Sequence, residues 1–251
     1  MTGAVIQARM GSSRLPGKVL MPLAGHPVLW HVVERLRRAT MLQKIIVATS
    51  TDKSDDPIAE FCTANNIECY RGSLTDVLAR YEGAAQAHNL STVVRITADC
   101  PLIDPAVVDK CVEMFAAGQG DYLSNINPGV RTFARGLDVE VFSREALARA
   151  HAAAQEQYER EHVTPYIWQN KQGEFVVLPA YRAPAQYAHI FRLTLDYAED
   201  YAVFEHLYKH FFSEGGIVDV PRVLQYLSEH PEVAAINASR EAEYPAQGLR
   251  V

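Results

Sequence analysis

The first half of this 251-residue chain alternates short apolar segments with helix-like ones, and this rhythm limits the folds open to it. Apolar runs at residues 3–8, 45–49 and 93–97 contain almost no polar residue, and a shorter strand-like run at 68–71 keeps the same spacing. Strands buried on both faces show such runs, and helical connections between them make them parallel. The sequence therefore predicts an α/β fold, in which two layers of helices enclose a mostly parallel sheet.

The second half follows a less regular pattern. Residues 122–188 mix short strands and helices, which predicts an inserted α/β segment. Within it we expect a strand at 136–142, where apolar and acidic residues alternate, and a helix at 159–169. Late strands are expected at 175–178 and 190–195, before the closing helices.

Composition excludes several functional classes. The net charge is −6, so the basic surface typical of nucleic-acid binding is not expected. No apolar run reaches the roughly 18 residues of a membrane span, and the start of the chain does not resemble a signal peptide. The four cysteines form no CxxC pair, which favours a reduced, cytoplasmic setting. No linker or repeat divides the sequence, so we expect a single domain over residues 1–251.

A loop rich in phosphate-binding residue types follows the first strand. Residues 9–18 hold two glycines, two serines and three basic residues, Arg9, Arg14 and Lys18. Backbone N–H groups, hydroxyls and fixed positive charge together suit a polyphosphate. The loop matches neither the Walker nor the GxGxxG pattern. The alternative is a solvated, flexible charged loop, but Gly11, Pro16 and Gly17 give its backbone definite turn preferences.

Two aspartates end strands that should reach the same edge of the sheet. Asp99 follows the strand at 93–97, and Asp196 follows the strand at 190–195. Ligands of open α/β sheets bind beyond the carboxyl ends of the strands, and Mg²⁺ takes oxygen ligands. Either aspartate could instead cap the turn or helix that follows it. Together, opposite a phosphate loop, they favour a divalent-metal site.

Several other polar residues suit an acceptor substrate. Asp138 and Glu140 share one strand face, where they can accept from sugar hydroxyls or meet solvent. The pair Glu161 and His162 can contact substrate, or the histidine can make a structural hydrogen bond. Four arginines are candidates to bind a substrate anion: Arg131, Arg135, Arg182 and Arg192.

Six separated blocks of the sequence carry a resemblance to a known family. The sequence Gln-Ala-Arg-Met-Gly-Ser-Ser-Arg-Leu-Pro-Gly-Lys resembles the start of the cytidylyltransferases that activate 2-keto-3-deoxy sugar acids. Within that family the likeness is greatest to the branch of spore coat polysaccharide biosynthesis. The blocks that agree in order lie at residues 7–20, 47–51, 70–81, 94–104, 160–164 and 192–196.

The resemblance implies a Rossmann-like nucleotidyltransferase fold of the GT-A-like, three-layer type. It implies that CTP binds with Mg²⁺ (or Mn²⁺) on Asp99 and Asp196, and that Arg9, Arg14 and Lys18 serve catalysis. It also implies a homodimer with its contact near residues 122–188. The implied nucleotide-binding residues are Ala8, Arg9, Met10, Gly11, Ser12, Ser13, Arg14, Lys18, Thr49, Arg71, Ser73, Arg80 and Thr97. From the residues themselves, our candidates for binding the acceptor are Arg135, Asp138, Glu140, Glu161, His162 and Arg192.

Two departures from the family pattern bear on the substrate. Thr97 stands where the octulosonate enzymes carry a glutamine, which leaves the sugar undetermined. Tyr197-Ala198 replaces the usual Thr-Pro after the second aspartate, which leaves the metal role intact.

We therefore expect an enzyme that transfers CMP from CTP to an anionic sugar, with release of pyrophosphate, in surface polysaccharide precursor synthesis. One alternative is a nucleotide-sugar-dependent glycosyltransferase, although Asp99-Cys-Pro lacks the second aspartate of a DxD pair. Others are a non-catalytic nucleotide-binding protein, and a cytidylyltransferase that acts on a phosphonate or a sugar phosphate.

Overall fold

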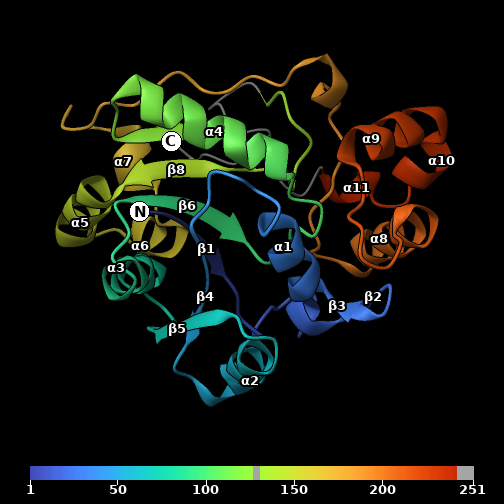
Figure 1. The fold of residues 1–251 in the computed structure, drawn as a ribbon, viewed down its shortest axis with the longest axis horizontal. Helices are drawn as coiled ribbons and strands as arrows, with labels where there is room; N and C mark the ends of the chain where they lie inside the picture. Colours follow the sequence, from blue (N-terminus) through green and yellow to red (C-terminus); the bar gives the residue numbers. More distant parts are fainter. Residues whose placement is uncertain (127–130, 242–251) are drawn as a thin grey trace.

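A computed structural model describes residues 1–126 and 131–241. Its six-stranded sheet has the order β5-β4-β1-β6-β8-β7 (Figure 1). The strands are β1 (Thr2–Gln7), β4 (Lys44–Ser50), β5 (Glu68–Gly72), β6 (Thr92–Thr97), β7 (Tyr122–Ser124) and β8 (Glu140–Ser143), and a small second sheet pairs β2 (Pro22–Leu23) with β3 (His26–Pro27). The first four strands of the order are parallel, and β8 runs antiparallel to both of its neighbours. The mostly parallel sheet is confirmed.

Helices cover both faces of this sheet. Val5 and Ile6 of β1 point to opposite faces, because side chains alternate along a strand, and each joins a separate hydrophobic core. The core around Ile6 includes residues of α1 and α4, and the core around Val5 includes residues of α3 and α5. The helices are α1 (Val28–Leu36), α2 (Asp56–Ala64), α3 (Val77–Ala87), α4 (Pro105–Gly118), α5 (Arg144–Ala153), α6 (Gln157–His162), α7 (Pro165–Gln169), α8 (Ala198–Phe211), α9 (Val220–Glu229), α10 (Pro231–Ala234) and α11 (Ala238–Glu241). The expected three-layer α/β arrangement is confirmed.

The register of the central strands places the site. Gln7 of β1 lies opposite Ala48 of β4 and Thr97 of β6, so these three parallel strands end at nearly the same level. The segments that follow β1 and β6 therefore leave the sheet side by side. A parallel arrangement thus brings together the loop at 9–18 and the turn that carries Asp99, although they are far apart in the sequence.

The segment at 122–188 contributes directly to the main sheet. Its strands β7 and β8 extend the sheet beyond β6. The single helix expected at 159–169 is divided into α6 and α7, because Val163 between them has a φ of +73° and Pro165 begins the second helix.

The expected strand at 190–195 does not join the sheet. It runs beside residues 134–137 and forms one isolated bridge, between Arg135 and Arg192. The two segments lie in close contact, since a Cβ on Gly136 would come within 1.8 Å of the Leu193 carbonyl oxygen, and Gly136 has a φ of +100°. The run at 175–178 likewise makes a single bridge, between Val177 and Tyr122 of β7.

Residues 198–241 form a group of helices at one side of the sheet. Helices α8 to α11 gather beyond α1, at the right of Figure 1. Among residues 1–126 and 131–241, every helix is too short or too polar to cross a membrane.

Candidate functional site

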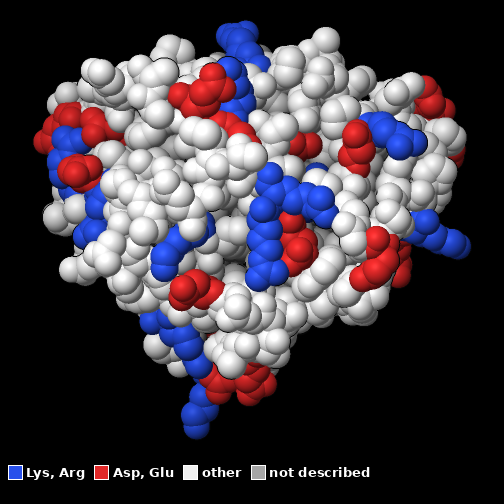
Figure 2. All heavy atoms as spheres, viewed as in Figure 1, with Lys and Arg blue, Asp and Glu red and all other residues white. Residues whose placement is uncertain are grey.

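A polar pocket of about 300 Å³ lies at the carboxyl ends of β1 and β6. The face drawn in Figure 2 is hollowed near its middle, where basic and acidic side chains meet. The pocket is lined by the first loop, by α3 and α6, and by the residues that follow β6. These lining residues are Gln7, Ala8, Arg9, Ser12, Ser13, Arg14, Lys18, Val19, Val77, Arg80, Thr97, Ala98, Asp99, Glu161, His162 and Asp196.

The loop at 9–18 has a defined conformation. The Met10 carbonyl accepts from the backbone N–H groups of Ser12 (2.9 Å) and Gly17 (3.0 Å), and Gly17 adopts a φ of +72° that favours glycine. From outside the loop, the fully buried carboxylate of Asp55 accepts from the Met10 N–H at 2.7 Å. These bonds hold the loop in a closed turn that places Lys18 at the floor of the pocket. The loop is therefore held by the fold and is not the flexible charged loop of the alternative interpretation.

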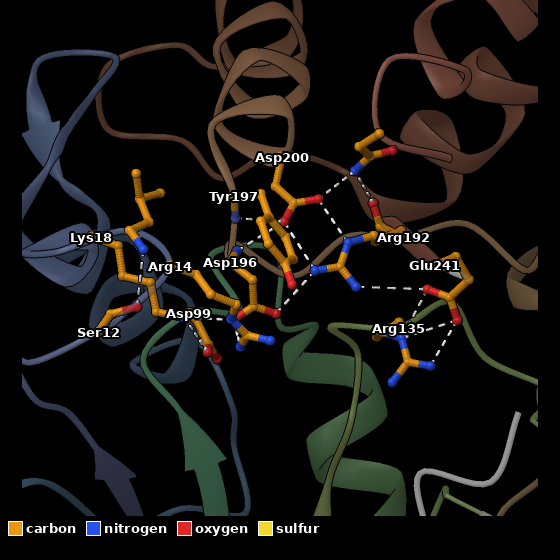
Figure 3. Close-up of polar contacts among 12 residues, drawn as sticks. Ser12, Arg14, Lys18, Asp99, Arg135, Arg192, Asp196, Tyr197, Asp200 and Glu241 are labelled. Atoms are coloured by element: carbon orange, nitrogen blue, oxygen red, sulfur yellow. Dashed lines mark hydrogen bonds and ion pairs between the residues drawn. The ribbon is translucent and has the colours of Figure 1, made fainter. Parts of the chain in front are cut away.

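Lys18 joins the two strand-end aspartates. Its ammonium lies 2.7 Å from Asp99 Oδ2 and 2.8 Å from Asp196 Oδ1 (Figure 3). We call these three residues the Lys18 cluster. Burial disfavours the charged ammonium, but the two carboxylates outweigh it and raise the pKa of Lys18. Burial also works against the Asp99 carboxylate, and there the Lys18 charge and the Thr97 hydroxyl prevail and lower the pKa of Asp99.

The two carboxylates of the Lys18 cluster are the residues that could hold a divalent cation. A cation already stands between two carboxylate oxygens, in the form of the ammonium group, so the spacing of Asp99 and Asp196 suits a positive ion. Two carboxylates alone do not complete a coordination shell, and residues 1–126 and 131–241 contain no group of three or more His, Cys, Asp or Glu able to hold a metal. Mg²⁺ in nucleotide sites commonly takes one or two carboxylates and fills its shell with phosphate oxygens and water, so this donor set fits.

The structure brings together most of the residues that the sequence proposed for CTP and metal. Ala8, Arg9, Ser12, Ser13, Arg14, Lys18, Arg80, Thr97, Asp99 and Asp196 all line the pocket, as do the acceptor candidates Glu161 and His162. Burial and the positive charge of Arg95 lower the pKa of His162, which favours a neutral imidazole at the pocket wall.

Five nucleotide candidates lie outside this lining: Met10, Gly11, Thr49, Arg71 and Ser73. Met10 supports the loop turn through its backbone, and Thr49 is fully buried in β4. The Arg71 guanidinium donates to the carbonyls of Ser50 and Asp52 and pairs with Asp56 at 2.7 Å.

The remaining acceptor candidates pair with other side chains of the protein. Arg135 forms a two-pronged pair with Glu241, and Arg131 pairs with Asp138. The Arg192 side chain is only 1% exposed and donates to Asp196 and Asp200. Arg192 is therefore buried against Asp196 and is not among the residues that line the pocket.

Glu140 is the centre of a closed polar cluster. Its carboxylate accepts from the Tyr122 hydroxyl (2.7 Å) and the Thr164 hydroxyl (2.5 Å), and it pairs with Arg95. We call these four residues the Glu140 cluster. Burial alone would lower the pKa of Arg95, but the neighbouring carboxylate raises it. Tyr122 and Glu140 also border a second hollow of about 380 Å³, whose lining includes Arg182.

Sequence reasoning missed two residues that shape the site. Gln7 lines the pocket, and its position as the last residue of the first strand was the available signal. Asp55 holds the loop by accepting from the Met10 N–H, and it also accepts from Ser50. The sequence did not reveal this role, because an aspartate at the start of a helix is expected to be a cap. A capping aspartate and a loop-holding aspartate have the same sequence signature.

Comparison with known proteins identifies one family. A cytidylyltransferase family model matches residues 4–220. The chain is 38% identical over 243 residues to the uncharacterized protein MJ1063 of Methanocaldococcus jannaschii, with 96% of both chains covered. It is 32% identical over 249 residues to the spore coat polysaccharide biosynthesis protein SpsF of Bacillus subtilis, covering 95% of this chain and 98% of SpsF. A shorter match, 32% identical over 133 residues, covers 51% of this chain and 50% of the 3-deoxy-manno-octulosonate cytidylyltransferase of Trichlorobacter lovleyi.

Solved structures agree with these relatives. A cytidylyltransferase from Leptospira borgpetersenii superimposes with a TM-score of 0.83 at 31% identity, covering 100% of this chain and 98% of that one. CMP:2-keto-3-deoxy-manno-octonic acid synthetase, solved in complex with CTP, has a TM-score of 0.60 at 16% identity, covering 83% and 98%. Rv0371C of Mycobacterium tuberculosis, solved in complex with manganese, has a TM-score of 0.53 at 16% identity, covering 82% and 97%.

The last two likenesses support the fold, which is the Rossmann-like nucleotidyltransferase fold expected from the sequence. The family match spans most of the chain and includes both the phosphate loop and the two strand-end aspartates. The protein therefore belongs to the cytidylyltransferase family of nucleotidyltransferases.

Proposed function

We propose that this protein transfers CMP from CTP to an anionic sugar, a 2-keto-3-deoxy sugar acid or a close relative, and releases pyrophosphate. The observation that carries the proposal is the Lys18 cluster, in which an ammonium from the phosphate loop meets two carboxylates at the floor of the pocket. Relatives named for spore coat polysaccharide and octulosonate chemistry support surface polysaccharide precursor synthesis as the setting.

The loop side chains account for binding and charge neutralisation. The triphosphate would lie along residues 9–18, where Arg9, Arg14 and Lys18 oppose the negative charge that grows on the departing pyrophosphate. The sugar hydroxyl would approach the α-phosphorus in line from the side opposite that leaving group. Such transfer depends mainly on positioning and electrostatic stabilisation, which a preformed loop supplies without reorganisation.

Asp99 and Asp196 would hold the divalent cation, Mg²⁺ or Mn²⁺, together with phosphate oxygens of CTP. When bound, such an ion neutralises phosphate charge and lowers the pKa of a nearby hydroxyl. The protein residues themselves set where it can bind: Thr97 and Lys18 fix the Asp99 carboxylate, and Arg14 and Arg192 contact Asp196 from two sides.

A pyrophosphate-release assay tests the function. The protein is incubated with each of the four nucleoside triphosphates, Mg²⁺, inorganic pyrophosphatase and a panel of sugar acids, and phosphate is measured. We expect release with CTP alone among the nucleotides, and only with an anionic sugar present. Cleavage of a nucleotide sugar without any triphosphate would instead show a glycosyltransferase.

Asp99→Asn provides the site control in this assay. Its amide keeps the shape but removes the charge, so we expect turnover to fall roughly 100-fold, on the scale of lost electrostatic stabilisation. Glu113→Gln makes the same chemical change at an exposed position of α4 and should leave turnover unchanged. Normal turnover in Asp99→Asn would remove the metal-binding role from the proposal.

We also propose that the protein is a homodimer with its contact in residues 122–188. Val176 (56% exposed) and Val177 (41% exposed) support this, because they run beside β7 at the end of the sheet. Sedimentation equilibrium should give twice the chain mass, and Val176→Asp should shift it toward the monomer. A monomeric mass of the unaltered protein at assay concentration would contradict the dimer.

A further inference from the structure

We propose that Asn237, in the C-terminal chain beyond the matched family region, is a positioning residue that fixes the Asp196 carboxylate through Arg192 and Asp200. The proposal rests on the proposed metal-binding role of Asp196. The family match ends at residue 220, so Asn237 is contributed by a part of the chain that the family model does not include.

Arg192 is the link that touches Asp196. Its guanidinium is 1% exposed and lies beside Asp196, with Nη2 donating to Asp196 Oδ2 at 3.0 Å (Figure 3). The other carboxylate oxygen, Oδ1, accepts from Lys18 and Arg14 on the pocket side. Asp196 therefore has Oδ2 bonded to the buried Arg192 and Oδ1 bonded to the basic residues of the pocket.

Asp200 sets the position of Arg192 and of the backbone at Asp196. Its carboxylate is fully buried and accepts from Arg192 Nε at 2.8 Å and from Arg192 Nη2 at 3.0 Å. The same carboxylate accepts from the backbone N–H groups of Asp196 and Tyr197, each at 2.9 Å. Both the side chain and the main chain of Asp196 thus depend on one buried carboxylate at the first turn of α8.

Asn237 closes this network from the C-terminal side. Its Nδ2 donates to Asp200 Oδ1 at 2.8 Å and to the Arg192 carbonyl at 3.0 Å, and the residue is 3% exposed. A single amide therefore ties the segment that holds Arg192 to the helix that holds Asp200. A buried carboxylate that loses a donor keeps its desolvation cost, so this contact matters more than an exposed one would.

Helix α11 reaches the same place through Glu241 and Arg240. Glu241 pairs with Arg135 at 2.7 Å and lies 3.8 Å from Arg192 Nη1. The Arg240 guanidinium lies over the Tyr197 ring at 4.5 Å, and Arg14 of the phosphate loop lies 5.1 Å from that ring. The C-terminal chain and the phosphate loop therefore both contact Tyr197, the residue next to Asp196.

Asn237→Ala tests the proposal in the full-length protein. Amide hydrogen exchange over residues 192–200, measured without any ligand, should be at least about tenfold faster, because the turn loses the bond that ties it to α8 and Arg192. With CTP and the sugar acid found in the release assay, kcat should fall about tenfold, while the KM for CTP changes less than threefold. This split is expected because Asn237 acts on Asp196 and leaves the loop at 9–18 intact.

Val233→Ala is the matched control. Val233 is buried in α10, so its truncation loosens the same C-terminal chain without touching Arg192 or Asp200. Protection of residues 192–200 and kcat should stay near those of the unaltered protein. Equal losses in both variants would show that the C-terminal chain acts only through general stability, and would overturn the proposal.

If Asn237→Ala does not fold, Glu241→Gln is the second variant, because the Glu241 side chain is 39% exposed and its change should cost the fold less. This variant should raise the rate of amide hydrogen exchange over residues 192–200 two- to threefold. An unchanged rate would show that α11 does not help to hold these residues. The proposed function fails separately: full turnover in Asp196→Asn would remove the metal role of Asp196, whereas the exchange result for Asn237→Ala does not depend on that role.

Discussion

The Lys18 cluster and the Glu140 cluster both pair a basic side chain with carboxylate groups, and each borders a hollow, but only the first lies in the pocket that we propose for CTP. Lys18, Asp99 and Asp196 all line the pocket, and the Asp99 side chain is 23% exposed. Glu140 is 6% exposed, and both of its oxygens accept from Arg95, Tyr122 or Thr164. The first cluster can exchange its internal partners for a ligand, whereas the second is already satisfied.

This difference separates catalytic charge from structural charge. Breaking a buried ion pair leaves an uncompensated charge and costs stability. Charge that faces a pocket contributes less to the fold and is available to stabilise a reaction. Substitutions in the Glu140 cluster should therefore affect folding, and substitutions in the Lys18 cluster should affect turnover.

The largest effect is expected for Glu140→Ala. The change leaves the Arg95 guanidinium buried without its carboxylate, so the free energy of unfolding should fall by about 3–5 kcal/mol. Urea titration followed by circular dichroism measures this. A loss below about 1 kcal/mol would show that the Glu140 cluster is not a closed structural unit.

Lys18→Ala should reduce turnover strongly and stability less, the reverse of Glu140→Ala. Turnover should fall roughly 100-fold, because the ammonium that faces the leaving phosphates is removed. The free energy of unfolding should fall less than in Glu140→Ala, because Asp99 stays partly exposed and Asp196 keeps its pairs with Arg14 and Arg192. Lys171→Ala, at an exposed position after α7, is the matched control and should retain full activity. If Lys18→Ala unfolds as readily as Glu140→Ala, the division between the two clusters is wrong.

The acid dependence of stability should distinguish the Lys18 cluster as well. The pKa of Asp99 falls from 3.8 to about 2 in the folded protein, where the Lys18 charge and hydrogen bonds outweigh the effect of burial. The stability that Asp99 contributes is therefore complete above about pH 4 and is lost as the pH falls toward 2. Its size should be about 1–2 kcal/mol, since one pKa unit corresponds to about 1.4 kcal/mol and the group is partly exposed.

Denaturant titrations at several pH values measure this loss, with Asp99→Asn for comparison. The variant should show a shallower decline of stability over that range. An identical decline in both proteins would mean that Asp99 is not held in its charged form by Lys18.

The smallest effect is expected for Asp138→Asn. Asp138 lies on the same chain segment as Glu140, but its ion pair with Arg131 is partly exposed, with the two side chains 28% and 21% accessible. Such pairs contribute about 0–1 kcal/mol, so the unfolding midpoint should barely move. A loss comparable to that of Glu140→Ala would show that exposure does not separate the two.

The first half of the fold could be predicted because local signals and tertiary structure agree there. The apolar runs at 3–8, 45–49 and 93–97 correspond to β1, β4 and β6. The basic residues after the first run identified the loop at 9–18 as the phosphate-binding candidate. Asp99 could be proposed because it follows β6, whose carboxyl end borders the phosphate loop. Asp196 was proposed from a strand at 190–195 that does not join the sheet; it reaches the same place because its segment runs beside Asp99, where the Leu195 N–H donates to the Asp99 carbonyl at 2.8 Å.

The second half was less predictable because its side chains find partners far along the chain. Arg135 and Arg192 have the residue type of an anion site, but Glu241, Asp196 and Asp200 already pair with them. Glu140 alternates with apolar residues like a ligand-facing residue, yet Arg95 of the neighbouring strand meets it. The spacing of residues within one segment does not reveal which of its charges pair with side chains from another segment of the chain.

The Lys18 contacts also have an order in synthesis and folding. The bond from Lys18 to Asp99 spans 81 positions, and the bond from Lys18 to Asp196 spans 178. A chain synthesised only as far as residue 119 holds β1, β4, β5 and β6 and can bring Lys18 to Asp99, but it does not yet contain Asp196. Closing the longer stretch of chain costs more entropy, so we expect the contact with Asp196 to form after the contact with Asp99.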